Sequence, residues 1–143
     1  MAGPYWTFFD FVSERGVNVI AEWLTDLPKS VWAALDNRLD YLAGERVPSR
    51  PAMAKLEGEY AELYEVRLKV NRVQYRPIAY RGASPRGQYT MLVGAREVGG
   101  KLIPRESYRT AFNRIADIEH GRGHVVEHER YDPSQEDRKS ATE

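Results

Sequence analysis

The sequence has no cysteine among its 143 residues, which excludes disulfide bonds, thiolate metal ligands and cysteine nucleophiles. It also has no uncharged apolar run near the roughly 20 residues that a membrane-spanning helix needs. No basic residues precede the aromatic stretch near the start, so the pattern of a signal peptide is missing. These absences predict a cytoplasmic protein that has no membrane partner.

Net charge is absent as well, because 21 basic side chains balance 21 acidic ones. The charges are nevertheless uneven along the chain. Residues 64–110 carry ten basic and three acidic side chains, whereas the segments before and after them are net acidic. A single Lys or Arg is usually only a solvated side chain. A basic segment within a neutral chain, however, indicates a surface that binds phosphate groups.

The hydrophobic periodicity predicts an α+β domain over residues 1–118. The expected elements are an N-terminal strand (5–12), a helical hairpin (19–27 and 28–43), three further strands (64–71, 73–81 and 89–96) and a C-terminal helix that begins at Pro104. We expect Asn71 and Arg72 to form a tight turn between the first two of the three strands. This order predicts an antiparallel sheet with helices on one face. Residues 119–143 are polar and acidic, so we expect a flexible tail there.

The alternation within residues 64–71 assigns the two faces of this sheet. Its apolar row should face the helices, and Glu65, Arg67 and Lys69 should face solvent. The following strands and loops add more basic side chains to the same region, namely Arg72, Arg76, Arg81, Arg96, Lys101 and Arg105. Arginine binds phosphate with two donors, and an interleaved tyrosine such as Tyr108 can stack on unpaired bases. The open face therefore suits an RNA backbone.

Four short motifs occur in a fixed order, each of them weak alone. They are K-L-E-G at 55–58, L-Y-E-V-R at 63–67, Y-R at 75–76 and P-x-x-x-Y-x-x-A at 104–111. Together they resemble the RelE/HigB-type toxins of bacterial type II toxin–antitoxin systems, in particular the phage-derived HigB-like branch. The resemblance implies a RelE/ParE-like fold and a ribosome-dependent mRNA endonuclease that uses no metal and no cofactor. The 2′-hydroxyl of the RNA would attack the adjacent phosphorus and leave a cyclic phosphate.

The resemblance also implies partners and site residues. The partners would be a cognate antitoxin, expected to be a helix-turn-helix protein, and mRNA on the ribosome. Arg67 and Arg76 would hold the RNA phosphate, although an ion pair between Arg67 and Glu65 or a helix carboxylate is an equally open reading of Arg67. Many members carry two lysines after the third strand. Here only Lys101 remains, so Arg96 and Lys101 are the candidate catalytic replacements.

The remaining expectations concern contacts, acids and metals. The candidate RNA-binding residues are Lys69, Arg72, Arg81, Arg105 and Tyr108. Tyr108 or His120 could donate a proton. His124 and His128 are spaced i, i+4 but have no nearby third ligand, so we expect no metal site.

The departure from the family at residues 94–101 leaves other functions open. One alternative is a non-catalytic binding protein of the same fold, such as a degenerate toxin or a phage protein. Another is a ParE-like poison of gyrase, although the basic face disfavours a protein target. The acidic residues 127–143 are an alternative partner for the basic face.

Overall fold

Two β-sheets form the centre of the fold in the computed structural model, which describes residues 4–82 and 87–132. The six strands of the large sheet lie in the order β10 (Gly123–Glu127), β1 (Thr7–Ser13), β7 (Gln88–Val93), β6 (Ile78–Arg81), β3 (Leu63–Val66) and β2 (Met53–Lys55). The small sheet has the order β4 (Leu68–Val70), β5 (Val73–Tyr75), β8 (Arg96–Val98) and β9 (Lys101–Ile103). The α+β class is confirmed.

The expectation of an antiparallel sheet is wrong for one pair of strands. β1 runs parallel to β7, with Phe8 opposite Tyr89, so the large sheet is mixed. Side-chain periodicity reveals which residues share a face, but it contains no information on strand direction. The direction of β7 relative to β1 depends on the whole path of the chain between them, which begins with α1 (Val19–Thr25) and α2 (Lys29–Ala43) and continues through β2 to β6.

The two strands predicted over 64–71 and 73–81 are each divided between the two sheets. β3 and β4 are separated at Arg67, and β5 and β6 are separated at Arg76 and Pro77. Pro77 has no N–H to donate to a ladder, so the pairing is interrupted there. The predicted turn is confirmed, because Asn71 and Arg72 have φ angles of 49° and 70° and β4 pairs with β5 around them.

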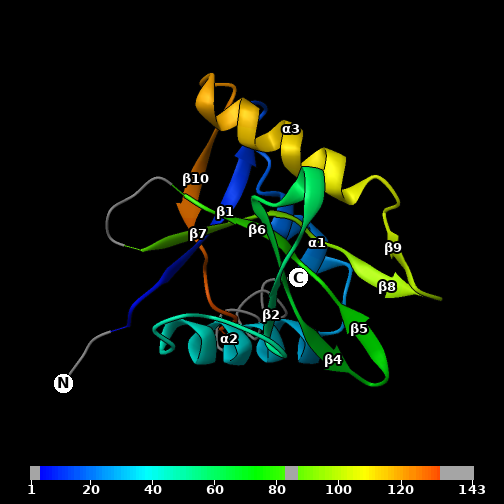
Figure 1. Cartoon of the computed structure of the whole chain (residues 1–143). Coiled ribbons are helices and arrows are strands. Elements are labelled where there is room, and N and C mark those ends of the chain that lie inside the picture. The colour runs from blue at the N-terminus through cyan, green and yellow to red at the C-terminus, as the bar shows by residue number, and fades with distance from the viewer. Residues whose placement is uncertain (1–3, 83–86, 133–143) are drawn as a thin grey trace, which may run out of the picture.

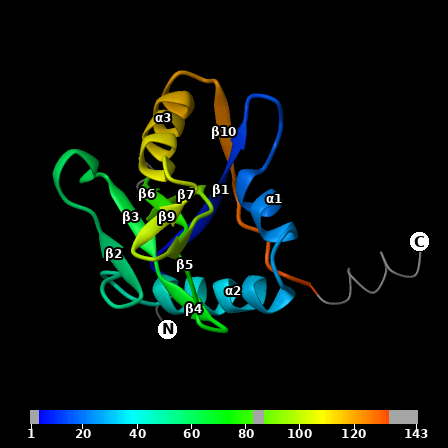
Figure 2. The same cartoon turned by 90° about the vertical axis from the view of Figure 1, so that its right-hand side faces the viewer.

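Helices cover both faces of the large sheet, not one as expected (Figures 1 and 2). α1 and α2 pack on one face through apolar side chains, of which Leu35 and Leu42 on α2 are fully buried. α3 (Ser107–Glu119) packs on the opposite face, where Ala111 and Ile115 join Leu63 in a second core. The row of side chains that contains Glu65, Arg67 and Lys69 begins at Leu63, two residues before Glu65. Leu63 is buried under α3, so α3 covers the start of this row. Within the described ranges, no helix combines the length and apolar character needed to cross a membrane.

The first part of the predicted tail is also structured. β10 pairs antiparallel with β1 and forms one edge of the large sheet. Its two valines are only partly buried or exposed, so apolar burial contributes little to its position. Backbone pairing with β1 holds it in place. Gly123 permits the close approach of the two strands, since a Cβ at this position would lie 2.8 Å from the Phe11 ring. The acidic end of the predicted tail, residues 133–143, lies outside the described residues.

Candidate active site

A buried carboxylate connects three of the predicted site residues beside the end of α3. Glu65 of β3 is only 3% exposed. Its Oε1 accepts a hydrogen bond from Arg67 Nη2 at 3.0 Å and lies 3.9 Å from Arg76 Nη1. Its Oε2 accepts a hydrogen bond from the Tyr108 hydroxyl, in the first turn of α3. We call these four residues the Glu65 cluster.

The two arginines of the Glu65 cluster are incompletely paired. Arg76 Nη2 donates to Gln74 Oε1 at 2.6 Å and lies 3.4 Å from Glu97 Oε2. Nevertheless Nε of Arg67 and both Nε and Nη1 of Arg76 are buried without a hydrogen-bond partner in the described part of the chain. A buried donor without a partner costs about 1–3 kcal/mol. An anion bound between the two guanidinium groups would satisfy these donors.

Strand register decides which predicted residues share this face. Lys69 pairs with Gln74, and Gln74 pairs with Glu97, so these three form one row across the small sheet. Arg67 lies two residues before Lys69, and Arg76 lies two residues after Gln74. Both arginines therefore lie on the same face as this row. The face carries the Glu65 cluster at its centre and Lys69 beside it.

The candidate catalytic replacements lie on the other face of the small sheet. Arg96 pairs with Tyr75, and Lys101 pairs with Val98, which lies two residues after Arg96 and therefore on the same face. Tyr75 packs in the core against α1 and α2, on the face opposite to Arg76. The structure therefore places Arg96 and Lys101 apart from Arg67 and Arg76. No alternation linked these segments, because a loop separates them from the first two strands.

Three other predicted residues lie outside the Glu65 cluster. Arg72 is exposed in the β4–β5 turn, and Arg105 is exposed ahead of α3. Arg81 stacks over the ring of Trp6, 4.8 Å from its centroid, at the end of β6 that points away from Arg76. Arg81 therefore belongs to a different part of the surface.

The electrostatics of the Glu65 cluster fix the position of one proton. Burial, followed by the hydrogen bond to Glu65, raises the pKa of Tyr108 far above its ordinary value. The phenol is therefore a neutral donor and Glu65 its acceptor. A carboxylate, two guanidinium groups and a phenol in contact can bind an oxyanion, accept a proton and return one.

Sequence reasoning missed Glu65 itself and placed it on a solvated face. A usable signal was its position two residues after Leu63, since residues at i and i+2 share a face of a strand. The expected ion pair between Arg67 and Glu65 is present. It is part of a larger group of side chains, and so does not by itself decide between the two readings of Arg67.

A second polar site was also missed, and it involves the segment that follows β10. His128 Nδ1 lies 2.9 Å from Asp10 Oδ1, and its Nε2 lies 3.1 Å from Asp36 Oδ1. Burial lowers the pKa of His128, but the hydrogen bonds and charges of the two carboxylates outweigh burial and raise it to about 9. Arg130 Nη1 donates to Asp40 Oδ2 at 2.7 Å. Asp36 and Asp40, one helical turn apart on α2, thus hold the end of the described chain.

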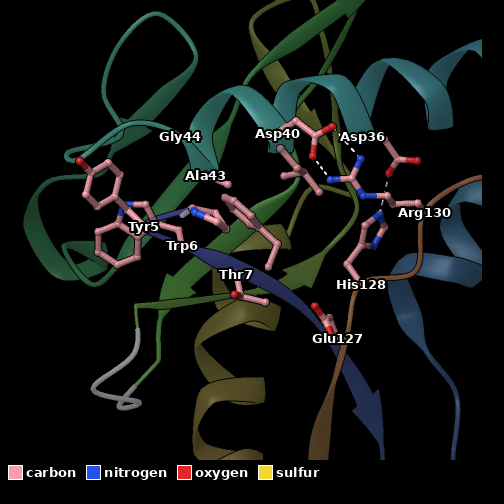
Figure 3. Close-up of a pocket in the computed structure, with 13 residues that line it drawn as sticks. Tyr5, Trp6, Thr7, Asp36, Asp40, Ala43, Gly44, Glu127, His128 and Arg130 are labelled. Carbon is pink, nitrogen blue, oxygen red and sulfur yellow. Dashed lines mark hydrogen bonds and ion pairs between the residues drawn. The ribbon is translucent and has the colours of Figure 1, made fainter. Parts of the chain in front are cut away.

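A groove of about 540 Å³ lies beside this second polar site (Figure 3). Tyr5 and Trp6 form one end of it, and the charged residues of α2 and of the C-terminal segment form the other. His128 contributes no free nitrogen, since both ring nitrogens contact carboxylates. His124, its predicted neighbour in spacing, is exposed on β10. Within the described ranges, no three His, Asp or Glu side chains are grouped so as to hold a metal ion.

Comparisons with protein-family models, with curated proteins and with solved structures find no significant match to the chain. The geometry described above is therefore the basis for assigning a function.

Proposed function

We propose that this chain is the toxin of a toxin–antitoxin system and cleaves mRNA at the Glu65 cluster. The observation that carries the proposal is the pair of guanidinium groups, Arg67 and Arg76, that meet at one buried carboxylate while three of their nitrogens have no hydrogen-bond partner among the described residues. A phosphodiester supplies the oxygens that these donors lack. The resemblance of the motifs at 55–67, 75–76 and 104–111 to RelE/HigB-type toxins supports the same assignment.

The residues suggest a mechanism that needs no group beyond the chain. Arg67 and Arg76 neutralise the phosphate as the 2′-oxygen forms its bond to phosphorus. Glu65 accepts the proton of the 2′-hydroxyl. The bond from phosphorus to the 5′-oxygen breaks, and this oxygen takes a proton from Tyr108. Tyr108 regains a proton from Glu65 through their hydrogen bond. The products are a 2′,3′-cyclic phosphate and a 5′-hydroxyl.

The surroundings of the Glu65 cluster also fit the partners that the resemblance implies. Lys69, Arg72 and Arg105 are exposed. Such side chains would contact the backbone of mRNA on the ribosome and slow dissociation at low salt. A cognate antitoxin would neutralise the protein by covering this basic face with an acidic or apolar segment.

Inducible expression in bacteria, with primer extension on a reporter mRNA, tests the proposal. We expect growth arrest and discrete cuts in translated message. Arg67→Ala and Arg76→Ala should each remove both effects. Arg109→Ala is a matched control, because Arg109 is exposed on α3 and forms an ion pair with the exposed Glu106. A double Arg67→Ala, Arg76→Ala variant that still cuts message would disprove the assignment. Arrest without cuts would indicate a protein target such as gyrase.

One observation favours a second candidate, a non-catalytic binding protein of the same fold. Arg96 and Lys101, the only replacements for the two lysines of the family pattern, lie on the far face of the small sheet. If lysines were essential for cleavage, the Glu65 cluster would bind RNA and leave it intact. Folded protein that binds RNA without arrest or cuts would support this candidate.

A further inference from the structure

Three aromatic rings lie side by side next to the Glu65 cluster, and the proposed mechanism uses only one of them. The Tyr60 ring lies 5.4 Å from the Tyr108 ring and 5.5 Å from the Phe112 ring, measured between centroids. All three side chains are partly exposed. Tyr60 belongs to the short 3₁₀ helix η1 (Gly58–Tyr60), which precedes β3, whereas the other two rings project from α3.

Tyr108 connects the aromatic rings with the charged groups. Its ring contacts Tyr60, and its hydroxyl donates to Glu65, which in turn accepts from Arg67. Tyr60 is thus separated from the guanidinium groups by two side chains, Tyr108 and Glu65. In a nucleic acid, the ribose sets the base apart from its phosphate in a comparable way. The partly exposed Tyr60 ring therefore offers an aromatic surface to the base beside a phosphate bound at the Glu65 cluster.

We propose that Tyr60 is a base-stacking residue of this RNA site and orients the nucleotide beside the scissile phosphate. The inference rests on the proposed function, because it uses the same phosphate site. Aromatic rings stack on every base, so Tyr60 would contribute affinity with little sequence preference. The bases of a duplex are already stacked, so stacking on Tyr60 requires an unpaired nucleotide.

The experiment measures fluorescence polarisation of a labelled single-stranded 2′-O-methyl RNA, which lacks the attacking hydroxyl and stays uncut. We expect Tyr60→Leu to weaken binding roughly ten-fold or more and Tyr60→Phe to retain it, since phenylalanine keeps the ring. Tyr41→Leu is the matched control, because Tyr41 is a 55% exposed tyrosine on α2. The salt dependence should not change in Tyr60→Leu, whereas Arg76→Gln should lower the slope by about one.

Two further measurements keep the inference testable if Tyr60→Leu unfolds. Tyr60→Trp should bind at least as tightly as the wild type. The wild type should also lose affinity for an oligonucleotide of the same length without bases. Equal binding by folded Tyr60→Leu and the wild type, or equal binding of the two oligonucleotides, would overturn the role of Tyr60 and leave the phosphate site intact. A wild type that binds no RNA, either free or as message on ribosomes, would overturn the proposed function as well.

Discussion

His128 Nε2 lies 3.1 Å from Asp36 Oδ1, and this contact ties the segment after the last strand to the second helix. The other ring nitrogen of His128 contacts Asp10 of β1. The backbone N–H of Tyr131 also donates to Asp36, at 2.7 Å. The positive charge of the His128 imidazolium therefore compensates the negative charges of Asp10 and Asp36, which are almost fully buried. The same contacts fix the C-terminal segment across β1 and α2.

Removing His128 should destabilise the fold strongly. His128→Ala would leave Asp10 and Asp36 without the charge that compensates them, and breaking a buried pair costs about 3–5 kcal/mol. We expect a loss of at least about 3 kcal/mol in the free energy of unfolding, measured by urea denaturation at pH 7. His124→Ala is the control, since His124 is exposed, and should change stability by less than about 0.5 kcal/mol. Equal effects of the two variants would contradict the role of His128.

Stability should fall at alkaline pH because of the same residue. The folded pKa of His128 is about 9, above its unfolded value of 6.5, so the folded protein binds the proton more tightly. The contribution is complete below pH 6.5 and is lost as the pH rises through 9. The difference corresponds to about 3 kcal/mol. Urea denaturation at pH 6, 7.5 and 9.5 measures it, and His128→Gln should flatten the profile. A wild-type profile as flat as that of His128→Gln would show that the two carboxylates do not hold the proton.

Glu65→Gln should separate RNA binding from cleavage. Glutamine keeps the shape of the side chain but accepts no proton and carries no charge next to the phosphate. We expect cleavage to fall about 10²–10⁴-fold while RNA binding is retained or strengthened. Initial rates of cleavage of a translated message and filter binding of the same RNA measure the two effects. Cleavage at the wild-type rate would exclude Glu65 as the base.

Tyr108→Phe should weaken both the fold and the reaction. The change removes the donor to the buried Glu65 carboxylate, which costs about 1–3 kcal/mol of stability. It also removes the acid assigned to the 5′-oxygen, so cleavage should fall even at temperatures where the variant is folded. Thermal unfolding and cleavage rates check both. Tyr41→Phe, on the exposed surface of α2, should change neither.

Gly94→Ala tests a close packing contact behind the small sheet. A Cβ at this position would lie 2.0 Å from the Trp23 ring, so Trp23 or the strand must move. We expect a loss of about 1–3 kcal/mol, measured by thermal unfolding. Gly44→Ala is the control, because its Cβ would have no neighbour closer than 3.6 Å. Equal stability of the two variants would show that Trp23 is free to move.

Local patterns in the sequence were enough to predict the α+β class, the first two helices and the turn at Asn71 and Arg72. These features depend on residues close together in the chain, where side-chain period and turn chemistry act directly. The pairing of Arg67 with Glu65 was also foreseen as one option, because the two residues are neighbours on one strand.

Only the tertiary structure decided the rest. The parallel β1–β7 pair, the second covered face and β10 all depend on contacts between distant segments, which no local period encodes. The same holds for the site: register separates Arg96 and Lys101 from Arg67 and Arg76, and α3 brings Tyr108 to Glu65. The sequence suggested that Glu65 is solvated, but the fold buries it. It becomes the centre of the cluster because a charge removed from water must find its partners within the fold.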